Sequence, residues 1–170
     1  SFPLFGVSFK TTVEVTPDYA TGHAAAACDE NQCVVWPVVI EKAVAQLAGG
    51  YNALNGEWVA RALSMVTGDH VHVIQLGWMT YTAAEIRRDL QSQKIVLLQT
   101  SNELPDDAKA AGLVEDHAYY VRAMQEEGGQ PRLMLHNPWD RRHPSPVPID
   151  AIRRWFGAVT VGSVKGAQTP

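Results

Sequence analysis

The sequence is poor in cysteine, which excludes a fold held together by a network of disulfides. Among 170 residues there are two cysteines, Cys28 and Cys33, whereas disulfide-stabilised secreted domains carry several pairs in a shorter chain. Asp-Glu-Asn-Gln separates the two, a spacing that suits opposite arms of a tight hairpin. They could pair in an oxidising compartment, so the sequence leaves the redox compartment open.

Long apolar runs and an excess of positive charge are also missing. Apolar runs such as residues 24–28 and 95–98 fall far short of the roughly 20 residues that a membrane-spanning helix needs. The net charge is −4 and the Lys and Arg residues are dispersed, which gives no electrostatic footprint for a polyanion. The sequence therefore predicts neither a nucleic-acid partner nor a membrane partner.

The composition that is present is that of an ordinary globular protein. Hydrophobic residues make up 46% and charged residues 19% of the chain, and no internal repeat, linker or low-complexity tract divides it. We therefore expect residues 1–170 to form one compact, soluble domain. The chain begins Ser1-Phe2-Pro3 without an initiator methionine or a signal-like segment, so we expect it to be a piece of a longer protein.

Strand and helix patterns follow one another along the chain. Period-2 alternation predicts a strand over residues 7–15, and the polar turn at residues 29–31 predicts a first hairpin over residues 23–28 and 32–35. Segments rich in β-branched or aromatic residues predict strands over residues 70–76, 94–100, 117–123 and 132–136, and a final strand is predicted over residues 158–161. Helices are predicted from Pro37 to Gly49-Gly50, over residues 57–66, from the Thr82-x-x-Glu85 capping box to residue 90, and over residues 150–156 with Asp150 as N-cap. The hydrophobic spacing predicts that the first two helices turn these side chains inward: Trp36, Ile40, Ala43, Val44 and Leu47, then Val59, Leu63 and Val66.

These elements predict an α+β fold with a mainly antiparallel sheet and three to four helices. The polar segment 125–131 is too short for a crossover helix, so the strands on either side of it should form a hairpin. A doubly wound α/β fold is the less favoured alternative.

The most informative stretch is Asp116-His117-Ala118-Tyr119-Tyr120-Val121, followed by Asn137-Pro138-Trp139. A histidine that removes a thiol proton must keep its ring in one orientation, and an asparagine oxygen that accepts from the far ring N–H does this. The predicted hairpin can bring His117 and Asn137 together, so we expect a ring nitrogen within about 3.5 Å of the amide oxygen. The alternative is a buried structural histidine and an unrelated Asn-Pro turn.

His-Ala-Tyr-x-Val followed by Asn-Pro-Trp resembles the signature of the calpain family of papain-like cysteine proteases. A second similarity runs through Trp36-Pro37, Glu41-Lys42-Ala43, Gly50-Tyr51-Asn52-Ala53-Leu54 and Gly56. The resemblance implies a papain-like half-domain, the second subdomain of the protease core. It also implies that His117 is the general base and acid, Asn137 its orienting residue, and Trp139 the side chain that shields their hydrogen bond.

In this family the nucleophilic cysteine lies on a separate N-terminal helix, and the glutamine of the oxyanion hole precedes it in the sequence. Neither segment is found in these 170 residues. Cys28 and Cys33 lack the Gly-x-Cys-Trp context of such a nucleophile, so a structural or disulfide role is favoured over catalysis. The resemblance thus implies peptide-bond hydrolysis of a protein substrate once a cysteine-bearing segment joins this chain, in cis or as a separate chain. The competing interpretation is a non-catalytic pseudoprotease, or a processed effector fragment, that acts as a protein-binding module.

No metal or cofactor is predicted. Family members bind calcium through an acidic loop after the Asn-Pro-Trp motif. Here the loop has Asp140 where glycine is usual and continues with Arg141, Arg142 and His143. Calcium needs six to eight oxygen ligands, and the neighbouring guanidinium groups disfavour it, so we expect a calcium-independent protein.

His70 and His72 present a second possible metal site, because alternate residues of a strand share one face. A third ligand nearby in the sequence is missing, so a solvated strand face is the favoured interpretation.

Overall fold

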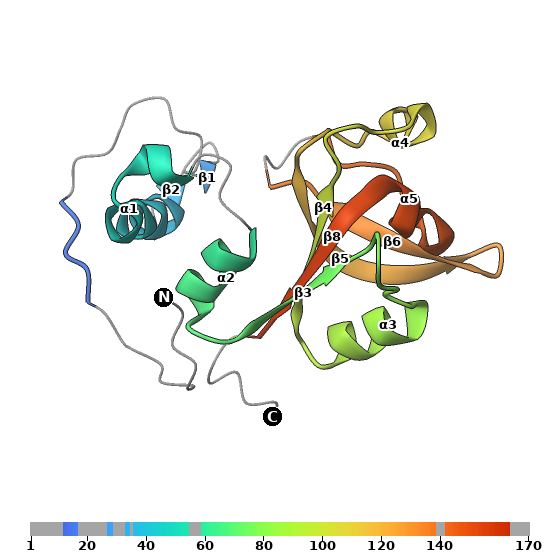
Figure 1. Cartoon of the computed structure of the whole chain (residues 1–170), viewed down its shortest axis with the longest axis horizontal. Coiled ribbons are helices and arrows are strands. Elements are labelled where there is room, and N and C mark those ends of the chain that lie inside the picture. Colours follow the sequence, from blue (N-terminus) through green and yellow to red (C-terminus); the bar gives the residue numbers. More distant parts are fainter. Residues whose placement is uncertain are drawn as a thin grey trace. The chain divides into compact units, whose positions relative to one another are not determined.

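A computed structural model describes residues 12–16, 27–28, 33–34, 36–54, 59–138 and 142–163. The chain divides into two compact units, residues 1–68 and 69–170, which are described in turn (Figure 1). The prediction that residues 1–170 make one domain stays a prediction. Within the described residues, no helix is both long and apolar enough to cross a membrane.

The first unit contains a short hairpin and three helical segments. Strands β1 (Ala27–Cys28) and β2 (Cys33–Val34) pair antiparallel with Cys28 opposite Cys33, which confirms the predicted hairpin. The helical segments are α1 (Trp36–Ala48), η1 (Tyr51–Leu54) and α2 (Val59–Thr67). Helix α1 ends at Gly49 and Gly50, as predicted, with both glycines at positive φ and the Gly50 amide donating to the Ala45 carbonyl at 2.7 Å.

Two expectations for this unit are wrong. Residues 12–15 of the predicted strand have no regular secondary structure, and residues 7–11 lie outside the described part. Several side chains predicted to face inward are also exposed: Ile40 by 37%, Leu47 by 48% and Val66 by 53%. An apolar stripe is buried only where another element packs on it, and the described sheet of this unit is one hairpin with two residues in each strand.

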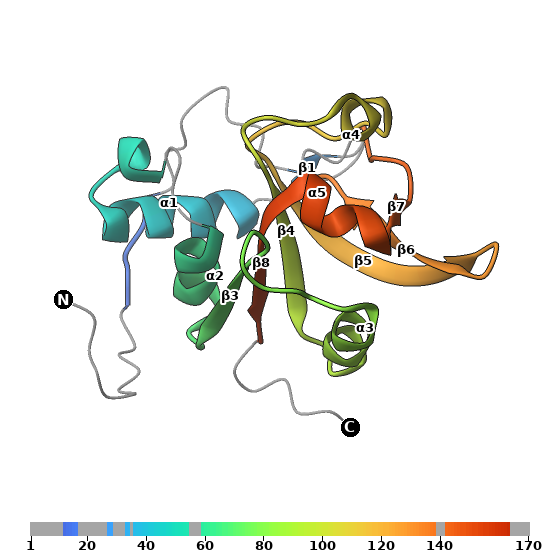
Figure 2. The same ribbon diagram turned by 45° about the vertical axis from the view of Figure 1, so that its right-hand side comes forward.

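The second unit is built on a six-stranded sheet in the order β3-β8-β4-β5-β6-β7, in which every pairing is antiparallel (Figure 2). Its strands are β3 (Val71–Gln75), β4 (Ile95–Thr100), β5 (Ala118–Glu127), β6 (Gln130–His136), β7 (Val147–Pro148) and β8 (Phe156–Gly162). Its helical segments are α3 (Ala83–Gln91), α4 (Asp106–Ala110), η2 (Ile149–Ala151) and α5 (Ile152–Trp155). The predicted α+β class with a mainly antiparallel sheet is confirmed.

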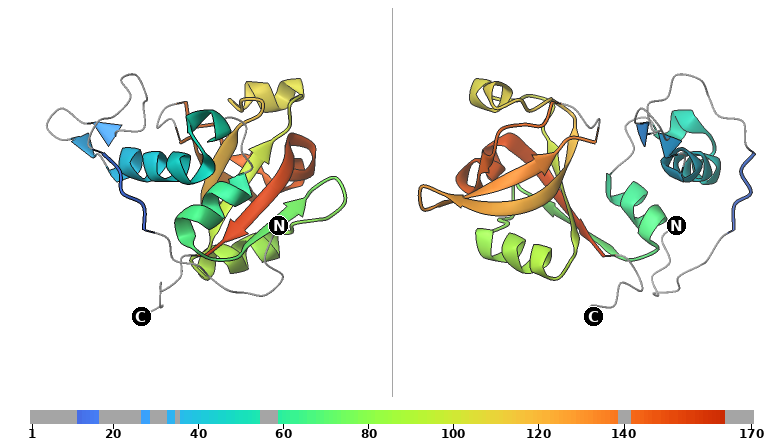
Figure 3. Two further views of the ribbon diagram at one scale, coloured as in Figure 1. Left: turned by 60° about the vertical axis from the view of Figure 1, so that its left-hand side comes forward. Right: turned by 180° about the vertical axis from the view of Figure 1, so that it is seen from behind.

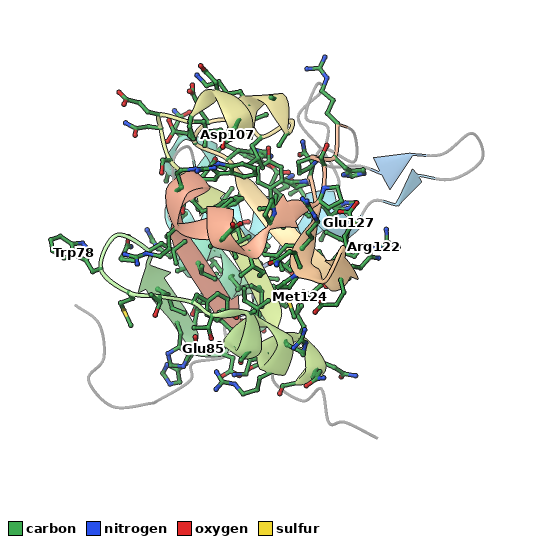
Figure 4. The ribbon with its side chains drawn as sticks, turned by 90° about the vertical axis from the view of Figure 1, so that its right-hand side faces the viewer. Trp78, Glu85, Asp107, Arg122, Met124 and Glu127 are labelled. Carbon is green, nitrogen blue, oxygen red and sulfur yellow. The ribbon has the colours of Figure 1, made fainter. Side chains whose placement is uncertain are left out.

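The long β5–β6 hairpin carries the two predicted catalytic motifs at its open end. It turns at Gly128 and Gly129, both at positive φ, and extends beyond the rest of the sheet (Figure 3). Toward the open end, Tyr119 and Val121 of β5 and Leu133 and Leu135 of β6 are buried in the core. This packing fixes the part of the hairpin from which the motifs emerge.

The helices differ from the prediction in two places. The capping box of α3 is present, with the Thr82 hydroxyl accepting from the Glu85 amide and the Glu85 carboxylate accepting from the Thr82 amide. Asp150 is not an N-cap, because the last helical segment begins at Ile149 as η2, with Pro148 at the cap position and no side-chain cap hydrogen bond. Helix α4 was not predicted: its five residues are too few for a periodic pattern, and it brings the described α-helices to five.

Candidate active site

The open end of the β5–β6 hairpin brings His117 and Asn137 into contact. His117 immediately precedes β5, Asn137 immediately follows β6, and the register pairs Tyr120 with His136. His117 Nε2 lies 3.0 Å from Asn137 Oδ1, within the predicted separation. The two side chains therefore meet as the motif spacing implied, while their catalytic roles stay a prediction.

Asn137 is fully buried, with 0% of its surface exposed. Its Nδ2 donates to the Arg142 carbonyl at 3.4 Å, and its backbone N–H donates to His143 Nδ1 at 3.1 Å. A buried amide is stable only when its polar atoms find partners. Because Nδ2 is directed to a carbonyl, which only accepts, Oδ1 is the atom that faces His117, and His117 Nε2 must carry the proton of their shared hydrogen bond.

The backbone of His117 is held by Thr100, the last residue of β4. The Thr100 amide donates to the His117 carbonyl, and the His117 amide donates to Thr100 Oγ1, each at 2.9 Å. The Thr100 hydroxyl lies 2.7 Å from the Val114 carbonyl, which accepts its proton. Thr100 is 3% exposed, so these bonds lie out of water and fix the Cα position of His117 relative to the sheet.

Tyr119 packs against the imidazole of His117. Its ring meets the His117 ring edge to face, with centroids 4.8 Å apart, and its hydroxyl accepts from the Val114 amide at 2.9 Å. Burial raises the pKa of Tyr119 above its usual value, so the phenol stays neutral near neutral pH. Asp116, just before His117, has a φ of 48°, a left-handed conformation that turns the chain sharply into β5.

We expect Thr100→Val to lower the free energy of unfolding by about 1–3 kcal/mol, because a similar shape is kept while the His117 amide and Val114 carbonyl lose a buried partner. Urea denaturation would measure this. Thr160→Val is a matched control, since Thr160 is equally buried at 3% but lies in β8, away from His117. An amide NMR shift at His117 in the Thr100 variant alone would locate the loss, and unchanged shifts there would contradict the assigned bond.

The other predicted residues are distributed as follows. Trp139, together with Asp140 and Arg141 of the predicted calcium-poor loop, lies outside the described residues, so its shielding role stays a prediction. Cys28 and Cys33 belong to the first unit, whereas His117 and Asn137 belong to the second. His70 and His72 are solvent-exposed, the second of them on β3, as the solvated-face interpretation predicted.

Sequence reasoning missed Thr100 and His143 as contacts of the pair. Thr100 ends the strand predicted over residues 94–100, and its pairing with the strand that starts at His117 was the available signal. His143 contributes to the basic character of its loop in the sequence, and no motif connects it to Asn137.

Comparison with known proteins gives a consistent result. The sequence model of the calpain family of cysteine proteases matches residues 5–156. The chain is 29% identical over 136 residues to the calpain-type cysteine protease DEK1 of Zea mays; the aligned region covers 72% of this chain and 6% of that protein. It is 30% identical over 129 residues to the calpain-like protease palB of Emericella nidulans, covering 72% of this chain and 15% of that protein.

A vertebrate relative is matched as well: calpain-13 of Rattus norvegicus is 30% identical over 111 residues, covering 61% of this chain and 17% of that protein. The chain thus spans less than a fifth of the length of each of these relatives. The family match extends over most of the chain and includes both the His117 and the Asn137 motifs. The chain belongs to the calpain family of cysteine proteases.

Proposed function

We propose that this chain supplies the histidine and the orienting asparagine of a calpain-type cysteine endopeptidase, and that a cysteine-bearing segment outside these 170 residues supplies the nucleophile, in cis or as a separate chain. The observation that supports this best is the 3.0 Å contact between His117 Nε2 and the buried Asn137 Oδ1. A hydrogen bond on the far ring nitrogen directs the near nitrogen, Nδ1, toward the reacting group.

In this mechanism Nδ1 of His117 takes the proton from the thiol, and the resulting thiolate attacks the carbonyl carbon of the scissile peptide bond. The imidazolium is stabilised by Asn137 Oδ1 while it carries the extra proton. It then donates a proton to the leaving amine, which leaves an acyl-enzyme that water hydrolyses with His117 again as base. Trp139 would shield the His117–Asn137 bond from water.

The first unit offers an apolar surface that such a segment could cover. Ile40 and Leu47 lie seven residues apart on α1 and are 37% and 48% exposed. Residues seven apart lie on one face of a helix, and exposed apolar side chains on one face are typical of a surface that packs against another element.

Turnover of a fluorogenic peptide by the chain alone, compared with the chain joined to a cysteine-bearing calpain segment, tests the proposal. We expect no turnover and no labelling by a thiol-directed epoxide in the first case, and both in the second, because hydrolysis needs the thiolate. The added segment with its cysteine changed to alanine is the control. Absence of turnover in the joined protein, with correct folding shown by circular dichroism, would refute the protease assignment.

The same experiment addresses the alternatives. A non-catalytic pseudoprotease or effector module would bind protein partners without turnover in either sample. A self-contained hydrolase that uses Cys28 or Cys33 would show turnover in the chain alone, and this turnover would disappear in Cys28→Ala or Cys33→Ala.

A further inference from the structure

The segment that follows the Asn-Pro-Trp motif contacts Asn137 twice. The Arg142 carbonyl accepts from the side-chain Nδ2 at 3.4 Å, and His143 Nδ1 accepts from the backbone N–H at 3.1 Å. Together with the bond to His117 at 3.0 Å, these contacts give hydrogen-bond partners to the Oδ1, the Nδ2 and the backbone N–H of Asn137. Asn137 is 0% exposed, so water does not substitute for them.

The direction of the Asn137 amide decides which ring nitrogen of His117 carries the proton. With Oδ1 toward His117, Nε2 is the donor and Nδ1 is left as the base. If the amide turned over, its NH₂ group would face Nε2, which would then have to accept, and the neutral ring would carry its proton on Nδ1. That tautomer cannot take a proton from a thiol through Nδ1.

The position of residues 142 and 143 is itself fixed. Pro144 is buried, and the Ser145 amide donates to the Ala111 carbonyl at 2.8 Å. Gly112, at a φ of 89°, allows close approach at this point, since a Cβ there would lie 3.4 Å from Pro144 Cα. The His143 ring also lies against the His136 ring, with centroids 4.5 Å apart and planes inclined by 32°.

We propose that Arg142 and His143 form a positioning pair: by holding the backbone N–H and the side-chain Nδ2 of Asn137, they keep its oxygen toward His117 and so select the Nε2-protonated tautomer. His143 is a positioning residue that acts through Asn137. Its contribution is the acceptor Nδ1, because an acceptor at that place prevents the backbone of Asn137 from turning.

Two substitutions distinguish the role of His143 as a hydrogen-bond acceptor from the packing of its ring against His136. His143→Phe keeps an aromatic ring against His136 and removes the acceptor, whereas His143→Asn removes the ring and keeps an acceptor near the position of Nδ1. The His143 side chain is exposed, so both variants should fold, which circular dichroism checks.

The first readout is nitrogen-15 NMR of the full 170-residue chain. In the unsubstituted protein we expect a scalar coupling across the hydrogen bond between the Asn137 amide nitrogen and His143 Nδ1, and a His117 ring protonated at Nε2. His143→Phe should shift the His117 tautomer toward Nδ1–H, and His143→Asn should restore Nε2–H. A missing coupling in the unsubstituted chain, an unchanged tautomer in the Phe variant, or recovery by Phe instead of Asn would each overturn the proposal.

The second readout rests on the proposed function. In the protease joined to its cysteine-bearing segment, His143→Phe should lower kcat roughly ten- to a hundredfold with little change in KM, because a misdirected base affects the chemical step more than substrate binding. His143→Asn should recover most of this loss. If the tautomer follows the prediction while the joined protein has no turnover, the proposed function fails and the positioning role stands. If turnover is present and His143→Phe has no effect on kcat, the positioning role fails and the protease assignment stands.

Discussion

His117→Ala, in the chain joined to a cysteine-bearing segment, is expected to lower kcat/KM by about 10⁴-fold or more, because members of a catalytic triad act as a unit. Asn137→Ala should cost less, roughly ten- to a hundredfold, since an imidazole without its amide partner still reaches the thiol part of the time. Initial rates on a fluorogenic peptide, under excess and limiting substrate, measure both effects.

His72→Ala is the matched control for this experiment. His72 is an exposed histidine on β3, a strand at the edge of the sheet opposite to β6 and β7, so its removal should leave the rate unchanged. Activity that survives His117→Ala would contradict the proposed mechanism, and activity that needs His117 together with Cys28 or Cys33 would establish the self-contained alternative.

The sequence predicted the part of the site that depends on local spacing. The short polar segment at residues 125–131 predicts a hairpin between the strands on either side of it, and His117 and Asn137, 20 positions apart, then fall at its open end. The turn length and the period of two set the register near the turn, whereas the register shift between Val121 and Ala123, closer to His117 and Asn137, has no signal in the pattern. The capping box of α3 was predictable from local spacing as well, because its bonds join residues three positions apart.

The surroundings of the pair could not be predicted in this way. Thr100 and His117 are 17 positions apart in the sequence and meet because their strands pair in the sheet. Arg142 and His143 are held in place by the neighbouring Ser145, which bonds to the Ala111 carbonyl, and by Pro144, which lies close to Gly112. These contacts arise from tertiary packing between segments whose own patterns are those of a strand end and a loop. A buried hydrogen-bond partner has no periodicity, so a single sequence carries little signal for it.

The helices of the first unit illustrate a different limit. The spacing of Ile40 and Leu47 correctly predicts one apolar face of α1, but both side chains are exposed. Periodicity tells which side chains share a face, and it does not tell whether an element is present to cover that face. The exposure of these residues is therefore consistent with the proposal that a further segment packs on α1.

A buried carboxylate outside the site leads to a prediction about stability. Asp89 on α3 is 3% exposed; its Oδ2 accepts from the Tyr81 hydroxyl at 2.9 Å and its Oδ1 accepts from Lys94 Nζ at 3.0 Å. These bonds connect the segment before α3, the helix itself and the residue before β4. Asp89→Asn should therefore lower the free energy of unfolding by about 2–3 kcal/mol near neutral pH, because hydrogen bonds to a charged group are lost in a buried place. Urea denaturation measures it.

The pH dependence of this loss has a definite sign. Burial alone would raise the pKa of Asp89, but the hydrogen bonds from Lys94 and Tyr81, together with the positive charges of Lys94 and Arg88, more than offset it and hold the pKa below the usual value for aspartate. A carboxylate with a lowered pKa in the folded state stabilises the protein above its unfolded-state pKa of about 4, and this contribution is lost as the pH falls through the folded-state value. The difference in unfolding free energy between the unsubstituted chain and Asp89→Asn should thus be full near neutral pH and shrink below about pH 4. Tyr81→Phe removes one of the two bonds and should show a smaller loss, about 1–2 kcal/mol. A difference for Asp89→Asn that stays constant from neutral to strongly acidic pH would show that the charge of Asp89 contributes nothing to the fold.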